Sequence, residues 1–127
     1  MTDLLDHLRD EVLLCDGAMG SRLQQAELDI EIDYWGQENC SEVLNLSRPD
    51  IVREIQQGFV AAGSDILLTN TFGGSAITLA EFDLQERTFE INKKAAELAR
   101  ESLEEFHRDG LSRYVLGEIG PGTKLPS

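Results

Sequence analysis

The sequence has little positive charge, and this shortage excludes two classes of partner. Only 11 of its 127 residues are Lys or Arg, against 24 Asp or Glu, so the formal charge is −13 and the pI is near 4.4. Because phosphate groups are neutralised by clustered Lys and Arg, this balance argues against nucleic acid and against anionic membrane surfaces as partners. No apolar run approaches the roughly 20 residues of a membrane span. The first residues are acidic where a signal peptide is basic.

Cysteine and histidine are also scarce. Cys15 and Cys40 lie far apart and form no C-x-x-C pair, so we interpret both as reduced thiols of a cytoplasmic protein, neither disulfide-bonded nor metal-bound. His7 and His107 lie in charged, helix-like segments without a partner at ligand or triad spacing. We therefore expect no metal site in this chain and no catalytic role for either histidine; the resemblance given below likewise implies no catalytic residue here. Its length fits one small domain or a piece of a larger one.

Three short apolar runs predict parallel strands near residues 12–15, 65–69 and 114–119. The run at 65–69 has no polar alternation and is too short for a helix, which is typical of a strand buried on both faces. Helical patterns separate the runs, and such crossovers are right-handed in nearly all proteins. The sequence therefore predicts an α/β fold in which the three runs are parallel neighbours in chain order.

A first long helix is predicted between the first two runs, over residues 47–62. Ser47 would cap it, Asp50 would complete a capping box, and Pro49 suits the first turn. Gly63 would end the helix. The expected apolar stripe consists of Ile51, Val52, Ile55, Phe59 and Ala62.

A second long helix is predicted over residues 88–106, and Gly110 would stop this helix. Its exposed side would carry the pairs Glu90–Lys94 and Glu104–Arg108. Its expected buried stripe consists of Ile91, Ala95, Leu98, Ala99, Ser102 and Phe106. Shorter helices are expected near 4–10, 21–26 and 77–82.

Residues 27–45 lack periodicity and predict a long loop over one end of the sheet. The loop is either functional, a lid, or a simple insertion. Its Trp35 either lines a pocket or pins the loop to the core.

Polar and glycine residues follow the predicted strands where α/β proteins bind their ligands. The first run ends in Asp16, Gly17, Ala18, Met19 and Gly20, and the second ends in Thr69, Asn70 and Thr71. Glycine permits close approach of the backbone to a ligand, and the exposed amides of such a turn can hold a carboxylate. The alternative is a plain strand-to-helix turn in which Asp16 caps the helix.

Four segments in register resemble the start of the homocysteine S-methyltransferase domain. They are residues 16–20, residues 43–49 (Val-Leu-Asn-Leu-Ser-Arg-Pro), residues 62–65 leading into 69–72, and residues 120–127 (Gly-Pro-Gly-Thr-Lys-Leu-Pro-Ser). The resemblance covers nearly the whole chain. It implies a (β/α)8 TIM barrel, of which residues 1–127 would be the first three β/α units and the N-terminal part of a single domain, so that the barrel is incomplete in this chain.

The resemblance also implies the chemistry. Homocysteine would bind through its amino-acid end, and a zinc ion held by three cysteines would convert its thiol to a thiolate nucleophile. Methylcobalamin is the implied methyl donor, and further partners would be the remaining barrel segment and folate- and cobalamin-binding modules. The zinc cysteines of the family belong to later strands. Cys40 follows an asparagine but lies too early, so neither Cys40 nor Cys15 is assigned to zinc.

Carried over by residue, Asp16 corresponds to the carboxylate that receives the ammonium group of homocysteine. The turn 17–20 would offer amides to the substrate carboxylate, and Thr69, Asn70 and Thr71 would line the pocket. Glu118 matches no functional position and is interpreted as structural or incidental. The resemblance implies methyl transfer to homocysteine to make methionine, with this chain inactive alone.

Two alternatives remain at this point. A phosphotransfer receiver domain also places an aspartate at a strand end, but it needs paired acids on the first strand and a lysine after the fifth. A truncated gene product that binds partners without catalysis is supported by length alone.

Overall fold

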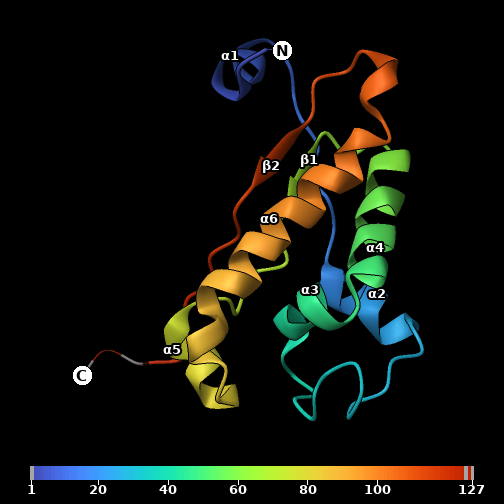
Figure 1. The fold of residues 1–127 in the computed structure, drawn as a ribbon. Coiled ribbons are helices and arrows are strands. Elements are labelled where there is room, and N and C mark those ends of the chain that lie inside the picture. Colours follow the sequence, from blue (N-terminus) through green and yellow to red (C-terminus); the bar gives the residue numbers. More distant parts are fainter. Residues whose placement is uncertain (1, 125, 127) are drawn as a thin grey trace.

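A small parallel sheet lies beside two long helices in the computed structural model, which describes residues 2–124 and 126. The strands run toward the lower end of the view, and α4 and α6 run back beside them (Figure 1). The elements are α1 (Leu4–Asp10), α2 (Met19–Gln25), η1 (Ser41–Val43), α3 (Leu44–Ser47), α4 (Pro49–Ala61), β1 (Ile66–Leu68), α5 (Ala76–Leu79), η2 (Ala80–Phe82), η3 (Gln85–Arg87), α6 (Thr88–Glu104), η4 (His107–Asp109) and β2 (Tyr114–Leu116). Leu125 and Ser127, two residues of the last resemblance segment, lie outside the described residues.

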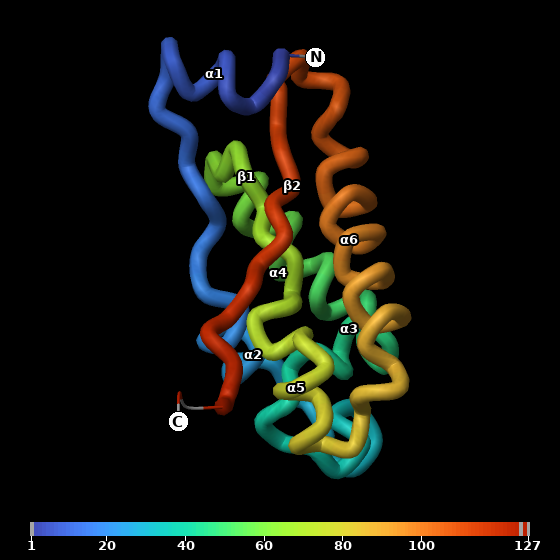
Figure 2. The backbone as a smooth tube through the Cα atoms, turned by 90° about the vertical axis from the view of Figure 1, so that its left-hand side faces the viewer, coloured from blue at the N-terminus to red at the C-terminus, as the bar shows by residue number. Residues whose placement is uncertain are grey.

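The sheet contains two strands, β1 and β2, which pair in parallel. Ile66 is opposite Tyr114, and Leu68 is opposite Leu116. Both strands are shorter than the predicted 65–69 and 114–119. In Figure 2 the segment before α2 runs along one side of β1, and β2 runs along the other. The predicted direction and order of the three runs are confirmed.

The buried strand predicted at 12–15 is reduced to a single parallel bridge between Cys15 and Ile66. The carbonyl oxygen of Leu14 accepts from the amides of Asp65 and Ile66, at 2.8 and 3.0 Å. Val12, in contrast, is 90% exposed and Leu14 is 58% exposed. An apolar run becomes a buried strand only where other elements cover it, and no described element covers this one. The first three β/α units predicted from the sequence are therefore confirmed only in part: among the described residues two runs form paired strands, and the first run is a single bridge.

The core lies between the sheet and the helices. Helix α4 contacts α6 and β1, and α6 contacts β2. The stripe predicted for α6 is confirmed at Ile91, Ala95, Leu98, Ala99 and Ser102, all buried. Phe106 lies beyond the end of α6 and is half-buried.

In α4 the predicted stripe is confirmed only in part. Val52 and Ile55 are buried, whereas Ile51 and Phe59 are half-buried against the same cluster. Ala62 is exposed. The buried residues of α4 also include Gln56 and Val60, which the predicted stripe omitted.

The predicted start of α4 was wrong. Arg48, not Ser47, occupies the N-cap position, and no side chain caps the helix. The Ser47 hydroxyl instead donates to the backbone carbonyl of Asp33, and Asp50 pairs with the Arg48 guanidinium at 3.0–3.1 Å. A long-range hydrogen bond has replaced the local cap. Gly63 does end the helix, with a positive φ of 115°.

The predicted ion pairs on α6 were also wrong. Glu90 pairs with Arg87, one turn before it, at 2.9 Å. Glu104 is the last residue of α6, so Arg108 lies outside the helix and loses the i,i+4 geometry. Within residues 2–124 and 126, the pair that does have this spacing on α6 joins Lys93 to Glu97.

The loop that begins at residue 27 ends earlier than predicted, because η1 starts at Ser41. Trp35 has a φ of 53°, and the Arg87 guanidinium lies 4.7 Å from the centre of its ring. This cation–π contact joins the loop to η3. Trp35 therefore pins its loop. No helix among the described residues combines the length and apolar character that a membrane crossing requires.

Candidate functional site

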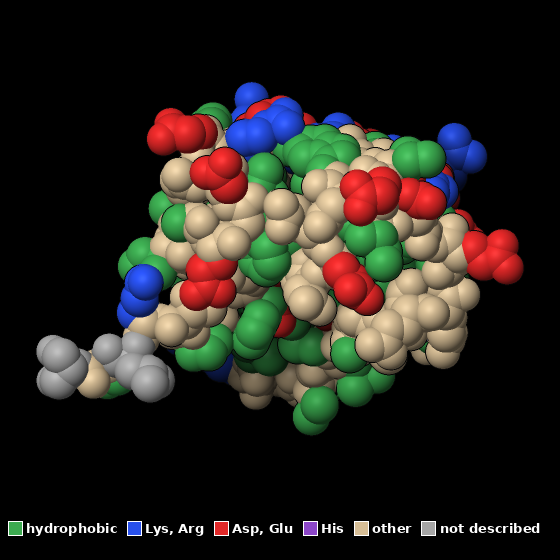
Figure 3. All heavy atoms as spheres, turned by 90° about the horizontal axis from the view of Figure 1, so that it is seen from below, with side chains coloured by type: hydrophobic (Ala, Val, Ile, Leu, Met, Phe, Trp, Pro, Cys, Tyr) green, Lys and Arg blue, Asp and Glu red, His purple; other side chains and the backbone are tan. Residues whose placement is uncertain are grey.

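A cavity of about 250 Å³ opens where β1 and its two neighbouring segments end. This is the carboxyl end of the parallel strands, where α/β folds place their ligands. Figure 3 views the molecule from this end: hydrophobic and acidic side chains are interspersed across the face, and Lys and Arg lie mainly at its margins. The lining residues are Asp16, Gly17, Ala18, Met19, Leu68, Thr69, Asn70 and Glu118.

Asp16 has one carboxylate oxygen that is bonded and one that is not. Its Oδ2 accepts from the Leu68 amide at 3.2 Å. Its Oδ1 is buried and has no hydrogen-bond partner among the described residues. Burial raises the pKa of this carboxyl group, and the Leu68 amide and its own amide only partly offset that rise. A buried acceptor left unpaired costs about 1–3 kcal/mol, so the site lacks a donor.

Gly17 sits tightly against α4. A Cβ atom at this position would lie 2.7 Å from a ring carbon of Phe59, so a side chain here requires the ring to move. The close packing fixes the turn that follows Asp16. Ala18 is the N-cap residue of α2, so Asp16 does not cap that helix.

The predicted turn 17–20 is divided between two elements. Gly17 and Ala18 form the turn proper, whereas Met19 and Gly20 already belong to α2. Gly17, Ala18 and Met19 line the cavity; Gly20 is exposed and does not.

Thr69 and Thr71 form a closed ring of hydrogen bonds with the backbone of Glu118. The Glu118 amide donates to Thr69 Oγ1 at 3.1 Å, and Thr71 Oγ1 donates to the Glu118 carbonyl at 2.7 Å. The two hydroxyl oxygens lie 2.7 Å apart. Since each hydroxyl has one hydrogen, Thr69 must donate to Thr71. Thr69 lines the cavity, and Thr71 acts behind it by holding Glu118.

Asn70 lines the cavity, but its side chain is occupied elsewhere. Its amide nitrogen donates to the Ser41 carbonyl at 2.9 Å and to Asn45 Oδ1 at 3.1 Å. Asn45 in turn donates to the Asn70 carbonyl at 2.9 Å. This pair joins the end of β1 to α3, so the asparagine side chain fixes the cavity wall.

The cysteines do not fit a zinc ion. Cys15 is exposed, whereas Cys40 is fully buried. Burial and the nearby Glu42 carboxylate raise the pKa of the Cys40 thiol to about 11, which disfavours the thiolate that zinc binds. Across the described chain, no three His, Cys, Asp or Glu residues are grouped so as to hold a metal.

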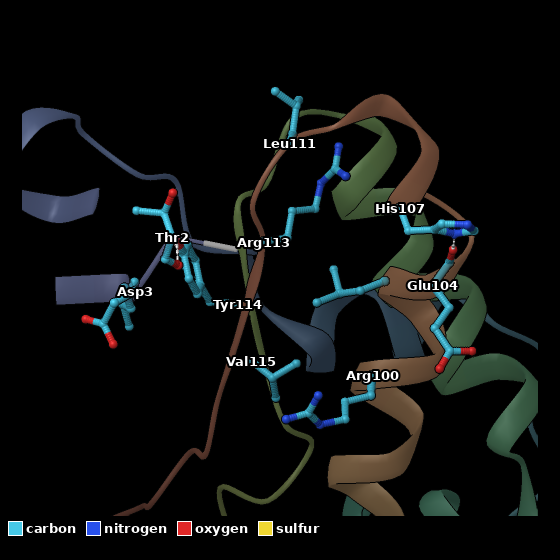
Figure 4. A pocket seen from close by; sticks show the side chains of 11 residues that line it. Thr2, Asp3, Arg100, Glu104, His107, Leu111, Arg113, Tyr114 and Val115 are labelled. Atoms are coloured by element: carbon cyan, nitrogen blue, oxygen red, sulfur yellow. Dashed lines mark hydrogen bonds between the residues drawn. The ribbon is translucent and has the colours of Figure 1, made fainter. Parts of the chain in front are cut away.

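A larger cavity, of about 500 Å³, lies at the opposite end of β2 between the chain start and the end of α6 (Figure 4). Several of its polar side chains are paired with near neighbours: Arg113 with Asp109, and the His107 ring with the Glu104 carbonyl. The Tyr114 hydroxyl donates to the Thr2 carbonyl at 2.8 Å. Size alone favours this cavity, but its position and paired groups make it the weaker candidate.

Comparison with known families matches residues 13–127 to the model described as homocysteine S-methyltransferase. The chain belongs to the homocysteine S-methyltransferase family. This membership agrees with the resemblance carried by the four sequence segments and leaves the receiver alternative without support.

Relatives and solved structures agree with this family. The chain is 43% identical to methionine synthase of Mycobacterium tuberculosis and 41% identical to methionine synthase of Mycobacterium leprae, each over 126 residues. These matches cover 99% of this chain but only 10% of each relative. The metallated form of the Escherichia coli homocysteine methyltransferase MmuM matches with a TM-score of 0.74 and 23% identity. That match covers 93% of this chain and 41% of MmuM, and shows a shared fold.

Glu118 lines the cavity, although from the sequence it is interpreted as structural or incidental. It follows the third apolar run just as Asp16 follows the first. The rule that led to Asp16, a polar residue at the carboxyl end of a predicted strand, also applies to Glu118. Glu118 differs from Asp16 in that it matches no functional position of the family resemblance.

Proposed function

We propose that this chain is the homocysteine-binding part of a methionine-synthase-type methyltransferase, and that the cavity at the strand ends holds the amino-acid end of homocysteine. The observation that carries the proposal is the buried, unpartnered Oδ1 of Asp16. A substrate ammonium supplies the donor and the positive charge that this oxygen lacks. Family membership and the two methionine synthase relatives support the choice of substrate.

Each wall of the cavity has a separate task in this proposal. Asp16 receives the ammonium group. The backbone amides of Gly17, Ala18 and Met19 are the nearest candidates for the substrate carboxylate, because this turn borders the cavity beside Asp16. Thr69 and Asn70 also line the cavity, Thr71 holds Thr69 and Glu118 from behind, and Gly20 lies outside the lining. Methyl transfer to the homocysteine thiolate would then make methionine.

We further propose that residues 1–127 are the N-terminal part of a single (β/α)8 barrel, containing its first three β/α units. The parallel order of the segment at Cys15, β1 and β2 supports this, as does the match to 41% of MmuM. The remaining barrel segment is then the first partner of this chain, and folate- and cobalamin-binding modules are further ones. Two free cysteines support a cytoplasmic location.

Zinc and methylcobalamin belong to the proposal only for the complete protein. The relative MmuM has a metallated form. Zinc would activate the thiol from ligands outside the described residues, because those residues do not fit it. Without such ligands, the chain alone would be inactive.

The test compares Asp16→Asn with the natural protein that contains this chain. Hydrogen bonds to charged groups contribute about 1.5–3 kcal/mol, so we expect homocysteine affinity to fall by roughly 10- to 150-fold. Isothermal titration calorimetry measures it. Asp10→Asn, at an exposed position in α1, is the matched control and should bind as the parent does. Unchanged affinity in Asp16→Asn would refute this assignment.

A further inference from the structure

The Glu118 carboxylate faces a site that already contains one carboxylate. Glu118 and Asp16 line the same cavity. In the part of the chain that the structure describes, the Glu118 side chain forms neither a hydrogen bond nor an ion pair, although its backbone amide and carbonyl are both bonded. The side chain is thus held in place at its base and left unpaired at its charged end.

The charged neighbours that affect the Glu118 carboxyl group are both carboxylates. Burial raises the pKa of Glu118, and the carboxylates of Asp16 and then Glu42 raise it further. Glu42 is itself committed, because its Oε1 accepts from the Gly73 amide at 2.7 Å. Asp16 retains the buried Oδ1 without a partner. The Glu118 carboxyl group and the unpaired Oδ1 of Asp16 therefore border one small cavity without a compensating cation from the described residues.

The ring of hydroxyl groups gives Glu118 a fixed position. Thr69 and Thr71 are buried, and both are bonded to its backbone. Binding groups whose supporting bonds are buried hold their geometry better than groups on free loops. Glu118 is therefore placed as firmly as Asp16, which is bonded to Leu68.

We propose that Glu118 is a second ammonium-binding residue of the substrate site, so that the α-ammonium of the amino acid bridges Asp16 and Glu118. This proposal rests on the proposed function and specifies its substrate class: a thiol amino acid with a free, charged α-amino group. A primary ammonium has three donors and can serve both carboxylates at once. Desamino and N-acylated thiols leave the two negative groups uncompensated and should bind more weakly than homocysteine.

The test uses Glu118→Gln in the natural protein that contains this chain. The probes are L-homocysteine and 4-sulfanylbutanoate, which is homocysteine without its amino group. Calorimetry should show that the substitution weakens homocysteine binding about tenfold, since charged hydrogen bonds are the stronger ones. It should not weaken binding of 4-sulfanylbutanoate. Glu81→Gln, at an exposed position in η2, is the matched control.

The outcomes separate the two proposals. Unchanged homocysteine affinity in Glu118→Gln, with tight binding by the parent, overturns the role of Glu118 and leaves the proposed function intact. Equal losses for both probes also overturn it, because they indicate a structural defect. Failure of the parent to bind homocysteine overturns the proposed function, and this inference with it.

Discussion

The two sides of the strand segments differ sharply in how well they are covered. On the helical side, Leu44, Leu67 and Leu98 are fully buried among α3, α4 and α6. The open surface, which we define as Val12, Leu14, Phe72 and Ile119, contains side chains that are 58–91% exposed. Figure 2 shows β2 and the segment before α2 in front of α4, toward the viewer. The same kind of apolar residue is therefore core on one side and solvent-exposed on the other.

This difference shows what the chain can stabilise by itself. Folding must offset about 1–2 kcal/mol of backbone entropy per residue, and burial of apolar surface is the main favourable contribution. The helical side supplies a packed core. The open surface supplies apolar area that the described residues leave exposed, and the chain spans about a tenth of the length of its methionine synthase relatives.

The largest effect is expected when the 127 residues are studied alone, which tests whether the helical side is sufficient for a folded monomer. We expect self-association or a partly molten state, because exposed apolar runs and unpaired strand edges are sites of association. Thermal denaturation should lack a sharp two-state transition in any strictly monomeric sample, with mass measured by light scattering. A cooperative monomer would show that the helical side is sufficient.

Substitutions on the two sides sharpen the comparison. In the natural protein that contains this chain, Leu98→Ala should lower the free energy of unfolding by about 2–5 kcal/mol, because it leaves a cavity in a packed core. In the isolated chain the exposed Val12→Ala should leave the denaturation profile essentially unchanged. If Val12→Ala has the same small effect in the natural protein, nothing covers the open surface there. Denaturant unfolding measures both effects.

The smallest expected effect concerns how the free energy of unfolding changes with pH because of Glu118 in the cavity. The folded state raises the pKa of Glu118, so it binds more protons than the unfolded state just above the ordinary value of 4.5. Stability therefore falls as pH rises through that window. Glu118→Gln should remove this loss and flatten the pH profile of unfolding. A profile as steep as that of the parent would contradict the assigned burial and repulsion.

Local patterns predicted the helices well and their surroundings less well. The stripe of α6 follows from a 3.6-residue period that needs no knowledge of the rest of the chain. The start of α4 did not follow, because the carbonyl of Asp33, 14 residues away, accepts the Ser47 hydroxyl. Burial at Val12 failed for the same reason, since it depends on elements distant in sequence.

The cavity followed the same division. Strand-end position indicated Asp16, Thr69 and Asn70, and the structure brings these residues together. Strand-end position did not predict that Thr71 would hydrogen-bond to the Glu118 backbone. Such a contact joins two chain segments and cannot be inferred from either segment alone. The binding roles of these residues remain predictions.

The contact between Gly17 and Phe59 has a consequence for how this protein can vary. The ring carbon stands where a Cβ at position 17 would be, so the two positions share one volume. A side chain gained at 17 is compatible with the turn only if the aromatic ring on α4 moves or is replaced by a smaller residue. The two positions should therefore behave as a genetic suppressor pair, in which harm from the first change is relieved by the second. Selection on the proposed binding turn thereby also constrains Phe59 on α4, which does not line the cavity.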